Sequence, residues 1–245
     1  MTLAALSEVE VDYARGRALG PLSLAIAPGE TLALVGPSGC GKSTALRLLA
    51  GLEAPTRGEV QRTPGVGETA VVFQAPTLAP WLSARANVAL PLELAGAPRR
   101  EAAKQAEAAL ARVGLSGAAG ARPAQLSGGM AMRVSLARAL VTEPRLMLLD
   151  EPFAALDEIT RRALADDVLA LWSMLKPAIV FVTHNVEEAV YMAGRVVVMT
   201  KGPGRIAADV PVEAPMPRPA GFRTDPTFRD AVERVSLALA QGMAA

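Results

Sequence analysis

Residues 36–43, GPSGCGKS, place three glycines, a lysine and two serines within eight positions. The spacing matches G-x-x-x-x-G-K-[ST], in which glycines let successive backbone N–H groups close around an anion. The lysine then reaches the β- and γ-phosphates of a nucleotide, and the last hydroxyl binds Mg²⁺. An apolar run, TLALV, precedes the match and a helical pattern begins near Lys42. Because this motif requires a strand before it and a helix after it, a phosphate-binding loop is favoured over a chance glycine-rich turn.

The residues expected to bind nucleotide through this loop are Gly36, Pro37, Ser38, Gly39, Cys40, Gly41, Lys42, Ser43 and Thr44. Cys40 is the only cysteine, which rules out a disulfide within this chain and suits a reducing compartment. Its position allows two interpretations. A helix start lowers the pKa of a nearby thiol and would make Cys40 reactive. The simpler interpretation, which we favour, is a small loop filler whose backbone N–H matters and whose sulfur does not.

A second group of chemically useful residues follows the apolar run LMLL at 146–149. The run ends in Asp150 and Glu151, where a buried strand would emerge beside the glycine loop. Asp150 can bind Mg²⁺ through water, and Glu151 can polarise an attacking water as a general base. An Asp-Glu pair alone is weak evidence, but together with the phosphate loop it predicts nucleotide hydrolysis.

The elements that must position these residues alternate between strand and helix patterns. Strand patterns occur at 6–13, 22–26, 31–35, 58–60, 69–73, 145–150, 178–183, 195–199 and 204–212. Helix patterns occur at 42–52, 83–94, 99–114, 128–140 and 158–175, and the tail places Phe228, Val232, Val235 and Leu239 on one helical face. We therefore expect a mostly parallel α/β sheet with a helical block inserted into it, closed by a C-terminal helix.

Composition narrows the choice of partners. Lys and Arg number 25 against 24 Asp and Glu, so the net charge of +1 argues against a nucleic-acid surface. The N-terminus lacks the pattern of a secretory signal. No stretch reaches the roughly 18 uninterrupted apolar residues of a membrane span. We expect a soluble chain that reaches a membrane only through another protein.

Further motifs resemble the ATP-binding cassette family, the motor subunits of ABC transporters. The matching segments are VVFQ, ending in Gln74 (the Q-loop), QLSGGMAMRVSLARAL at 125–140 (the signature), AALD, ending in Asp157 (the D-loop), and VTHN with His184 (the switch histidine). Tyr13 falls where the family keeps an aromatic ring that stacks on adenine. The resemblance runs from about residue 3 to residue 210, and the motifs follow the family order.

The resemblance implies a P-loop NTPase fold with an N-terminal antiparallel β region. It predicts a catalytic core from 1–76 and 142–210, a helical subdomain at 77–141 and a tail helix at 211–245. ATP and Mg²⁺ are the expected cofactors, with Ser43, Gln74 and Asp150 around the metal. The implied catalytic residues are Lys42, Gln74, Glu151 and His184. A lone histidine is ordinarily structural, but this one follows a strand and could orient Glu151 and the water.

The signature implies that the protein acts in pairs. Ser127, Gly128 and Gly129 begin a helix, and in the family this end contacts the γ-phosphate held by the other subunit. Two copies would then hold two ATP molecules head to tail, and Asp157 joins the nucleotide-contacting set. ATP favours the closed dimer, and hydrolysis removes that preference.

Membrane partners also follow from the resemblance. In the family, Gln74 and the helical subdomain form a groove for an integral membrane permease. Trp81 and Leu82 are candidates for that groove, or equally for the subdomain core. A periplasmic or lipid-anchored substrate-binding protein would be an indirect partner, and no nucleic acid is expected. The chain would lie peripherally on the cytoplasmic face of the inner membrane.

The segments APWLSARANVALPLEL, LSGGM and GPGRI resemble the subgroup that serves nitrate, sulfonate and taurine importers, so a small anion or organic oxyanion is the expected cargo. Met132 stands where Gln is usual and Asn185 where Asp is usual. The alternative is an ABC ATPase of cell division or lipoprotein release. A generic P-loop kinase or GTPase does not account for LSGGM.

Overall fold

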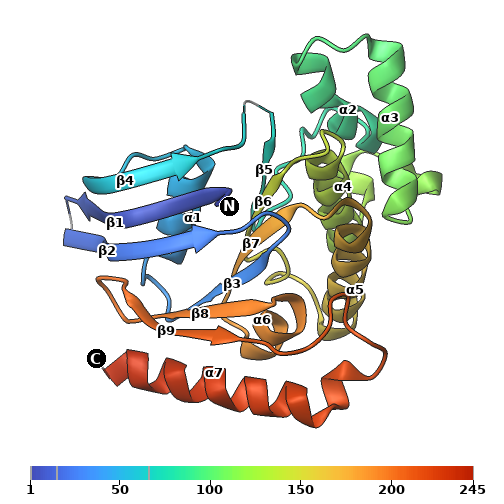
Figure 1. Ribbon diagram of the computed structural model, residues 1–245. Helices are drawn as coiled ribbons and strands as arrows, with labels where there is room; N and C mark the ends of the chain where they lie inside the picture. Colours follow the sequence, from blue (N-terminus) through green and yellow to red (C-terminus); the bar gives the residue numbers. More distant parts are fainter. Residues whose placement is uncertain (1, 15, 66, 245) are drawn as a thin grey trace.

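The computed structural model describes residues 2–14, 16–65 and 67–244, so Val66 and the predicted outer limits 1 and 245 lie outside it. The strands are β1 (Ala4–Tyr13), β2 (Gly16–Ile26), β3 (Thr31–Val35), β4 (Arg57–Arg62), β5 (Thr69–Val72), β6 (Leu146–Asp150), β7 (Ala178–Thr183), β8 (Arg195–Met199) and β9 (Ile206–Pro211). The α-helices are α1 (Lys42–Ala50), α2 (Ala84–Leu94), α3 (Arg99–Arg112), α4 (Gly128–Leu140), α5 (Glu158–Leu175), α6 (Val186–Met192) and α7 (Pro226–Ala244). Figure 1 shows their arrangement.

The first sheet is three-stranded, in the order β2-β1-β4, and both strand pairs are antiparallel. Along β2, Leu22, Leu24 and Ile26 are buried while the residues between them are exposed. This alternation is expected where one face of a sheet packs on a core and the other faces water. The predicted antiparallel N-terminal region is confirmed.

The second sheet is six-stranded, in the order β5-β6-β7-β3-β8-β9. The first five strands are parallel, and only β9 pairs antiparallel, with β8. Every residue of β3 and β7 is buried, which explains why these strands read as unbroken apolar runs. The predicted mostly parallel α/β core is confirmed.

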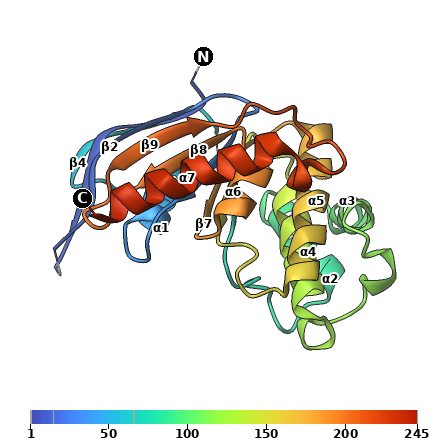
Figure 2. The same ribbon diagram turned by 90° about the horizontal axis from the view of Figure 1, so that it is seen from below.

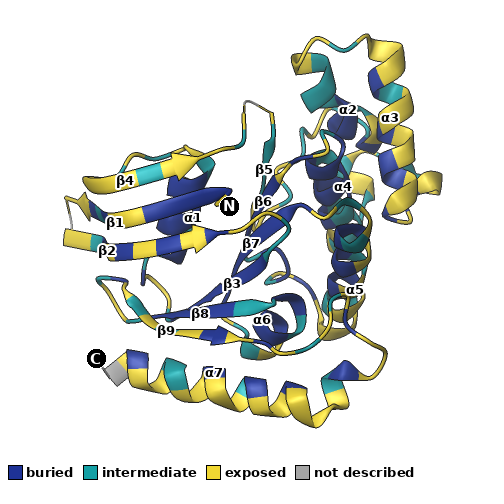
Figure 3. Cartoon of the chain, in the orientation of Figure 1, coloured by how far each residue is buried: buried dark blue, intermediate teal, exposed yellow. Residues whose placement is uncertain are grey.

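Helices cover both faces of the core sheet. In Figures 1 and 2, α2, α3 and α4 form a block to one side of the strands, and α7 runs along β8 and β9. Phe228, Ala231 and Val235 of α7 are buried, and the side of α7 that faces away from the sheet is largely exposed in Figure 3. The predicted tail helix at 211–245 therefore forms only over Pro226–Ala244, where the apolar spacing packs it on the core; the chain from 212 to 225 is largely irregular.

Two local predictions differ from the structure. Helix α6 follows His184 directly and was not expected, because seven residues are too few to show a helical period. The helix pattern predicted at 42–52 extends too far. That helix ends at Ala50 with Gly51 in the left-handed conformation, so Leu52 lies beyond it and is exposed. Among the described residues, no helix is both long and apolar enough to cross a bilayer.

Candidate active site

Strand register brings the predicted site residues to one edge of the core sheet. Val72 of β5 pairs with Leu149 of β6, and Asp150 pairs with Val182 of β7. Val35, at the end of β3, pairs with Thr183. Since these four strands are parallel, the loops that follow them emerge side by side. The loop at 36–41, Gln74, Glu151 and His184 all follow these strand ends.

The glycines of the phosphate loop are required by its shape. Gly39 and Gly41 have φ of +77° and +94°, which side chains rarely adopt. A Cβ on Gly41 would lie 2.8 Å from the carbonyl oxygen of Ala18, and one on Gly36 would lie 2.8 Å from Cys40 Sγ. The loop is therefore packed tightly on its own residues and on the start of β2.

Lys42 is buried at the centre of this loop. Its Nζ donates to the carbonyl oxygens of Gly36 at 2.8 Å and Pro37 at 2.9 Å. Gly41, the N-cap of α1, has no side chain to cap the helix. The N–H groups of the first turn and the lysine ammonium thus provide an anion-binding end, which fits the phosphates of ATP.

Two pairs of polar side chains face each other beside the loop. Ser43 Oγ donates to Asp150 Oδ1 at 2.8 Å, and a hydroxyl next to a carboxylate is a donor set that suits Mg²⁺. His184 Nδ1 lies 3.3 Å from Glu151 Oε2. The structure therefore brings each predicted carboxylate to a predicted polar partner.

The backbone of Glu151 is strained. Its φ is +46°, a conformation that costs a non-glycine residue about 1–3 kcal/mol. The N–H of Glu151 donates to Val182 O at 3.0 Å, which holds the residue against the end of β7. Strained backbone conformations are common at functional sites. Here the left-handed conformation of Glu151 turns the chain directly after Asp150, the last residue of β6.

A pocket of about 330 Å³ opens over these groups. It is lined by Tyr13, Ala18, Ser38, Gly39, Gly41, Lys42, Ser43, Thr44 and Glu151. Its volume falls within the about 300–1,000 Å³ of small-molecule sites. The Tyr13 hydroxyl donates to Glu53, and desolvation together with Glu53 raises the Tyr13 pKa. The Tyr13 ring itself is half-exposed at the edge of the pocket.

Cys40 is part of the loop, and it is fully buried. Burial raises the pKa of its thiol, and the charge of Lys42 opposes that effect only in part. A buried thiol with a raised pKa is a poor nucleophile. These observations favour the loop-filler interpretation over the reactive-thiol one.

Other predicted residues lie outside the pocket lining. Gln74 is exposed in the loop after β5. Ser127 caps α4 by accepting from Met130 N at 3.2 Å, and both Ser127 and Gly128 are exposed. Asp157 caps α5, and hydrogen bonds from Thr160 lower its pKa. One chain therefore assembles the phosphate loop with both carboxylates but leaves the signature end facing solvent.

The departures from family pattern have structural explanations. Met132 is buried in the hydrophobic core between the helical block and the sheet. Asn185 caps α6 by accepting from Glu188 N at 3.1 Å, as an aspartate would. Trp81 is 73 % exposed, which excludes the core interpretation for it, while Leu82 is half-buried.

Sequence reasoning did not assign a site role to Gly204 in the GPGRI segment. Gly204 O accepts from Gly20 N at 2.9 Å, and Gly204 N donates to Ala18 O at 3.2 Å. A Cβ at this position would lie 1.8 Å from Cys40 O. The segment therefore packs directly on the phosphate loop. The motif was visible in the sequence, but its contact depends on the fold.

Comparison with known proteins agrees with this geometry. A family model described as "ABC transporter" matches residues 19–154. An ATP-binding protein of Brucella abortus is 44 % identical over 94 % of this chain and 90 % of its own length. An aliphatic sulfonates import ATP-binding protein of Pseudomonas fluorescens is 49 % identical over 85 % of this chain and 76 % of its own.

Solved structures agree as well. A dimeric ATP-binding cassette in a post-hydrolysis state, bound to ADP and Pi, has a TM-score of 0.76 and 30 % identity, covering 86 % of this chain and 99 % of that one. The cbiO1 protein of Clostridium perfringens, part of an ABC transporter complex, also has a TM-score of 0.76, with 26 % identity over 85 % of this chain and 88 % of its own. The chain therefore belongs to the ABC transporter family, as an ATP-binding subunit that hydrolyses ATP.

Proposed function

We propose that this chain powers import of a small anion or organic oxyanion, of the sulfonate, nitrate or taurine type, through a separate membrane permease. The observation that carries its ATPase role is the convergence of Lys42, the Ser43–Asp150 pair and the Glu151–His184 pair at one sheet edge. The sulfonate-importer relative at 49 % identity supports the cargo class.

Each residue at the edge has a role that its chemistry supports. The Lys42 ammonium donates to two carbonyl oxygens that phosphate oxygens can replace. It can therefore bind the β- and γ-phosphates instead. Ser43 and Asp150, with Gln74, would hold Mg²⁺, which neutralises phosphate charge when bound. Glu151 takes a proton from water, and His184 holds the Glu151 carboxylate in place.

The exposed signature end supports a two-chain site. Ser127, Gly128 and Gly129 form a helix N-terminus that does not line the pocket over this chain's own phosphate loop. We propose that it closes over ATP bound to a second copy, in a head-to-tail dimer with Asp157 at the junction. The structural relative bound to ADP and Pi is itself a dimer.

The helical block supports a permease partner. We propose residues 77–141 as a subdomain distinct from the core at 1–76 and 142–210, with 211–245 as its tail. Trp81 is exposed on it, and a pocket of about 250 Å³ lies where β5 meets α2 and α4. A permease helix docked there would hold the chain on the cytoplasmic face of the inner membrane, with a periplasmic or lipid-anchored binding protein as an indirect partner.

The test is Glu151→Gln, which keeps the size of the side chain and removes the general base. We expect ATP turnover to fall by at least about a hundredfold, with ATP affinity changed by less than about threefold. Light scattering should show an ATP-dependent dimer, because without hydrolysis the closed dimer does not reopen.

The matched control is Glu187→Gln, an exposed carboxyl in the first turn of α6. It should hydrolyse ATP within about twofold of the wild-type rate. Undiminished hydrolysis in Glu151→Gln would remove Glu151 from the mechanism. Cargo class is tested separately, by whether a multi-span permease and a sulfonate-binding protein co-purify with the chain.

A further inference from the structure

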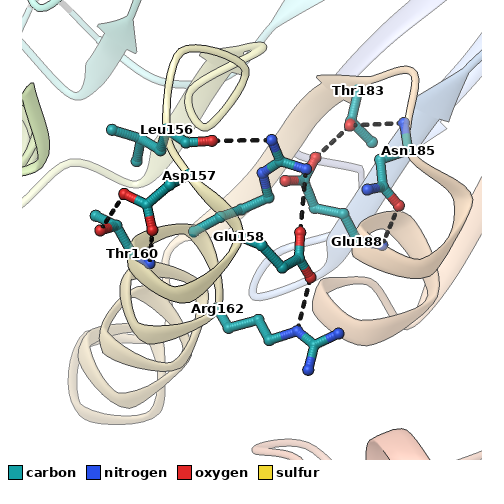
Figure 4. A network of polar contacts seen from close by, with 9 residues as sticks. Leu156, Asp157, Glu158, Thr160, Arg162, Thr183, Asn185 and Glu188 are labelled. Carbon is teal, nitrogen blue, oxygen red and sulfur yellow. Dashed lines mark hydrogen bonds and ion pairs between the residues drawn. The ribbon is translucent and has the colours of Figure 1, made fainter.

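Two sets of polar contacts, one at the start of α5 and one at the turn that carries His184, appear together in Figure 4 and share the lining of one small cavity. The Thr183 hydroxyl donates to the Glu188 carboxylate and accepts from Asn185 N at 3.1 Å. The backbone N–H of Glu188 donates to Asn185 Oδ1 at 3.1 Å. His184 lies between Thr183 and Asn185, so these bonds fix the backbone on both sides of it.

Glu188 is unusual because its side chain is an acid that is only 9 % exposed. Burial raises its pKa, and so does the charge of Glu151, whereas the Thr183 hydrogen bond and the charges of Arg161 and His184 lower it. A buried carboxylate is costly unless a cation or hydrogen bonds compensate it. Arg161 is the permanently charged cation among these neighbours.

Arg161, on α5, lowers the Glu188 pKa through its charge but makes its direct polar contacts elsewhere. Its Nη2 donates to Leu156 O at 3.0 Å, and its Nη1 lies 3.4 Å from Glu158 Oε2. Its Nε is buried and lacks a hydrogen-bond partner among the residues that the structure describes. Arg161 and Glu188 line the same cavity of about 20 Å³, together with Arg162 and Arg223. This volume is enough for one bridging water.

The carbonyl group that accepts from Arg161 belongs to Leu156, in the segment that packs against the signature end of α4. Leu156 precedes Asp157, whose carboxylate accepts from the Thr160 N–H at 3.0 Å and the Thr160 hydroxyl at 2.7 Å. A Cβ on Gly129 would lie 2.7 Å from Thr160 Cγ2. The signature end of α4 therefore packs on the same turn of α5 from which Arg161 projects.

We propose that Arg161 is a positioning residue for hydrolysis, which holds the loop at Leu156 and compensates the Glu188 charge beneath His184. This inference rests on the proposed roles of Glu151 and His184. Without the guanidinium, Glu188 loses the cation whose charge acts on it most strongly, and Thr183 loses a fixed partner. The turn then no longer holds His184 Nδ1 at 3.3 Å from Glu151 Oε2. ATP binding at the phosphate loop is not expected to depend on this arrangement.

Arg161→Met tests the proposal, with Arg162→Met as its matched control. Both arginines contact Glu158, but Arg162 is on the exposed side: its side chain is 54 % exposed against 26 % for Arg161. We expect Arg161→Met to lower kcat about tenfold with the KM for ATP changed by less than about twofold. Arg162→Met should leave both constants within about twofold of wild type.

Glu188→Gln separates charge from packing, because the amide oxygen can still accept from the Thr183 hydroxyl. If Arg161 acts through the Glu188 charge, Glu188→Gln should lower kcat about threefold and Arg161→Met/Glu188→Gln should be no slower than Arg161→Met. The expected loss of kcat is therefore not additive. If Arg161→Met does not fold, the kcat of Glu188→Gln alone decides the point.

Three outcomes would overturn the proposal: equal kcat in Arg161→Met and Arg162→Met, a raised KM with unchanged kcat, or losses that add in the double variant. Wild-type turnover together with Glu151→Gln is measured in the same assay. If Glu151→Gln hydrolyses ATP normally, the proposed function has failed; if only the Arg161 variants behave as wild type, the positioning role alone has failed.

Discussion

Two helices of this chain begin beside glycines, and they begin differently. Helix α1 starts after Gly41, which has no side chain to cap it, and the buried Lys42 follows. Helix α4 is capped by the hydroxyl of Ser127, and Ser127 and Gly128 are exposed. Either N-terminus attracts anions through its N–H groups and dipole. Only the first has the carboxylates of β6 and the histidine after β7 beside it.

The comparison shows that a helix N-terminus can form a complete anion-binding site in one place and only half of a site in another. At α1, the parallel sheet supplies the remaining groups from neighbouring strand ends within the same chain. At α4, the end projects from the helical block toward solvent. A second chain that brings its own phosphate loop would complete it, which agrees with a dimeric structural relative.

The largest effect on ATP affinity is expected when the positive charge at the N-terminus of α1 is removed. Lys42→Met removes the charge from the buried centre of the loop, and we expect ATP affinity to fall at least about a hundredfold. Lys201→Met, at an exposed position, should bind ATP within about twofold of wild type. Calorimetric titration with ATP and Mg²⁺ measures both. Wild-type affinity in Lys42→Met would contradict the assignment of the loop.

A smaller effect is expected at the α4 end, where cap and charge can be separated. Aspartate and asparagine both cap helices well, so Ser127→Asp and Ser127→Asn should keep their melting temperatures. Only Ser127→Asp places a negative charge against the partner's phosphate. We expect it to lower ATP turnover about thirtyfold while one chain still binds ATP normally. Equal turnover in the two variants would argue against a signature contact with phosphate.

The smallest effect concerns the buried thiol within the loop before α1. Because burial raises the pKa of Cys40, the thiol stays protonated at pH 8 and becomes a thiolate only above its shifted pKa. We expect native protein to react with a maleimide at least about tenfold more slowly than protein unfolded in guanidinium. Cys40→Ala is the unlabelled control and should hydrolyse ATP within about threefold of wild type. Fast native labelling would restore the reactive-thiol interpretation.

The sequence was sufficient for features that repeat along a strand or within a loop. The buried strands at 31–35 and 178–183 match their apolar runs, since both faces of a parallel sheet are covered. Ser43 and Asp150 were expected around one metal ion because their motifs follow strands of one sheet, and the structure places the two side chains in a hydrogen bond.

Features that depend on packing between distant segments could not be predicted in the same way. Helix α6 is too short to show a period, and the cavity that Arg161 and Glu188 share requires α5 and α6 to be placed first. Trp81 has an apolar side chain but is exposed. A single sequence contains no pattern that distinguishes an exposed docking residue of this kind from a core residue.

The fit of Gly204 against Cys40 has a consequence for how relatives of this chain can diverge. Any side chain at 204 would have to displace the backbone that cradles phosphate, so the GPGRI segment and the glycine loop are constrained as one unit although they are far apart along the chain. Substitutions in the two segments should therefore occur together across relatives, whatever solute those relatives carry. Recurrence of GPGRI would then report selection on loop geometry rather than on cargo.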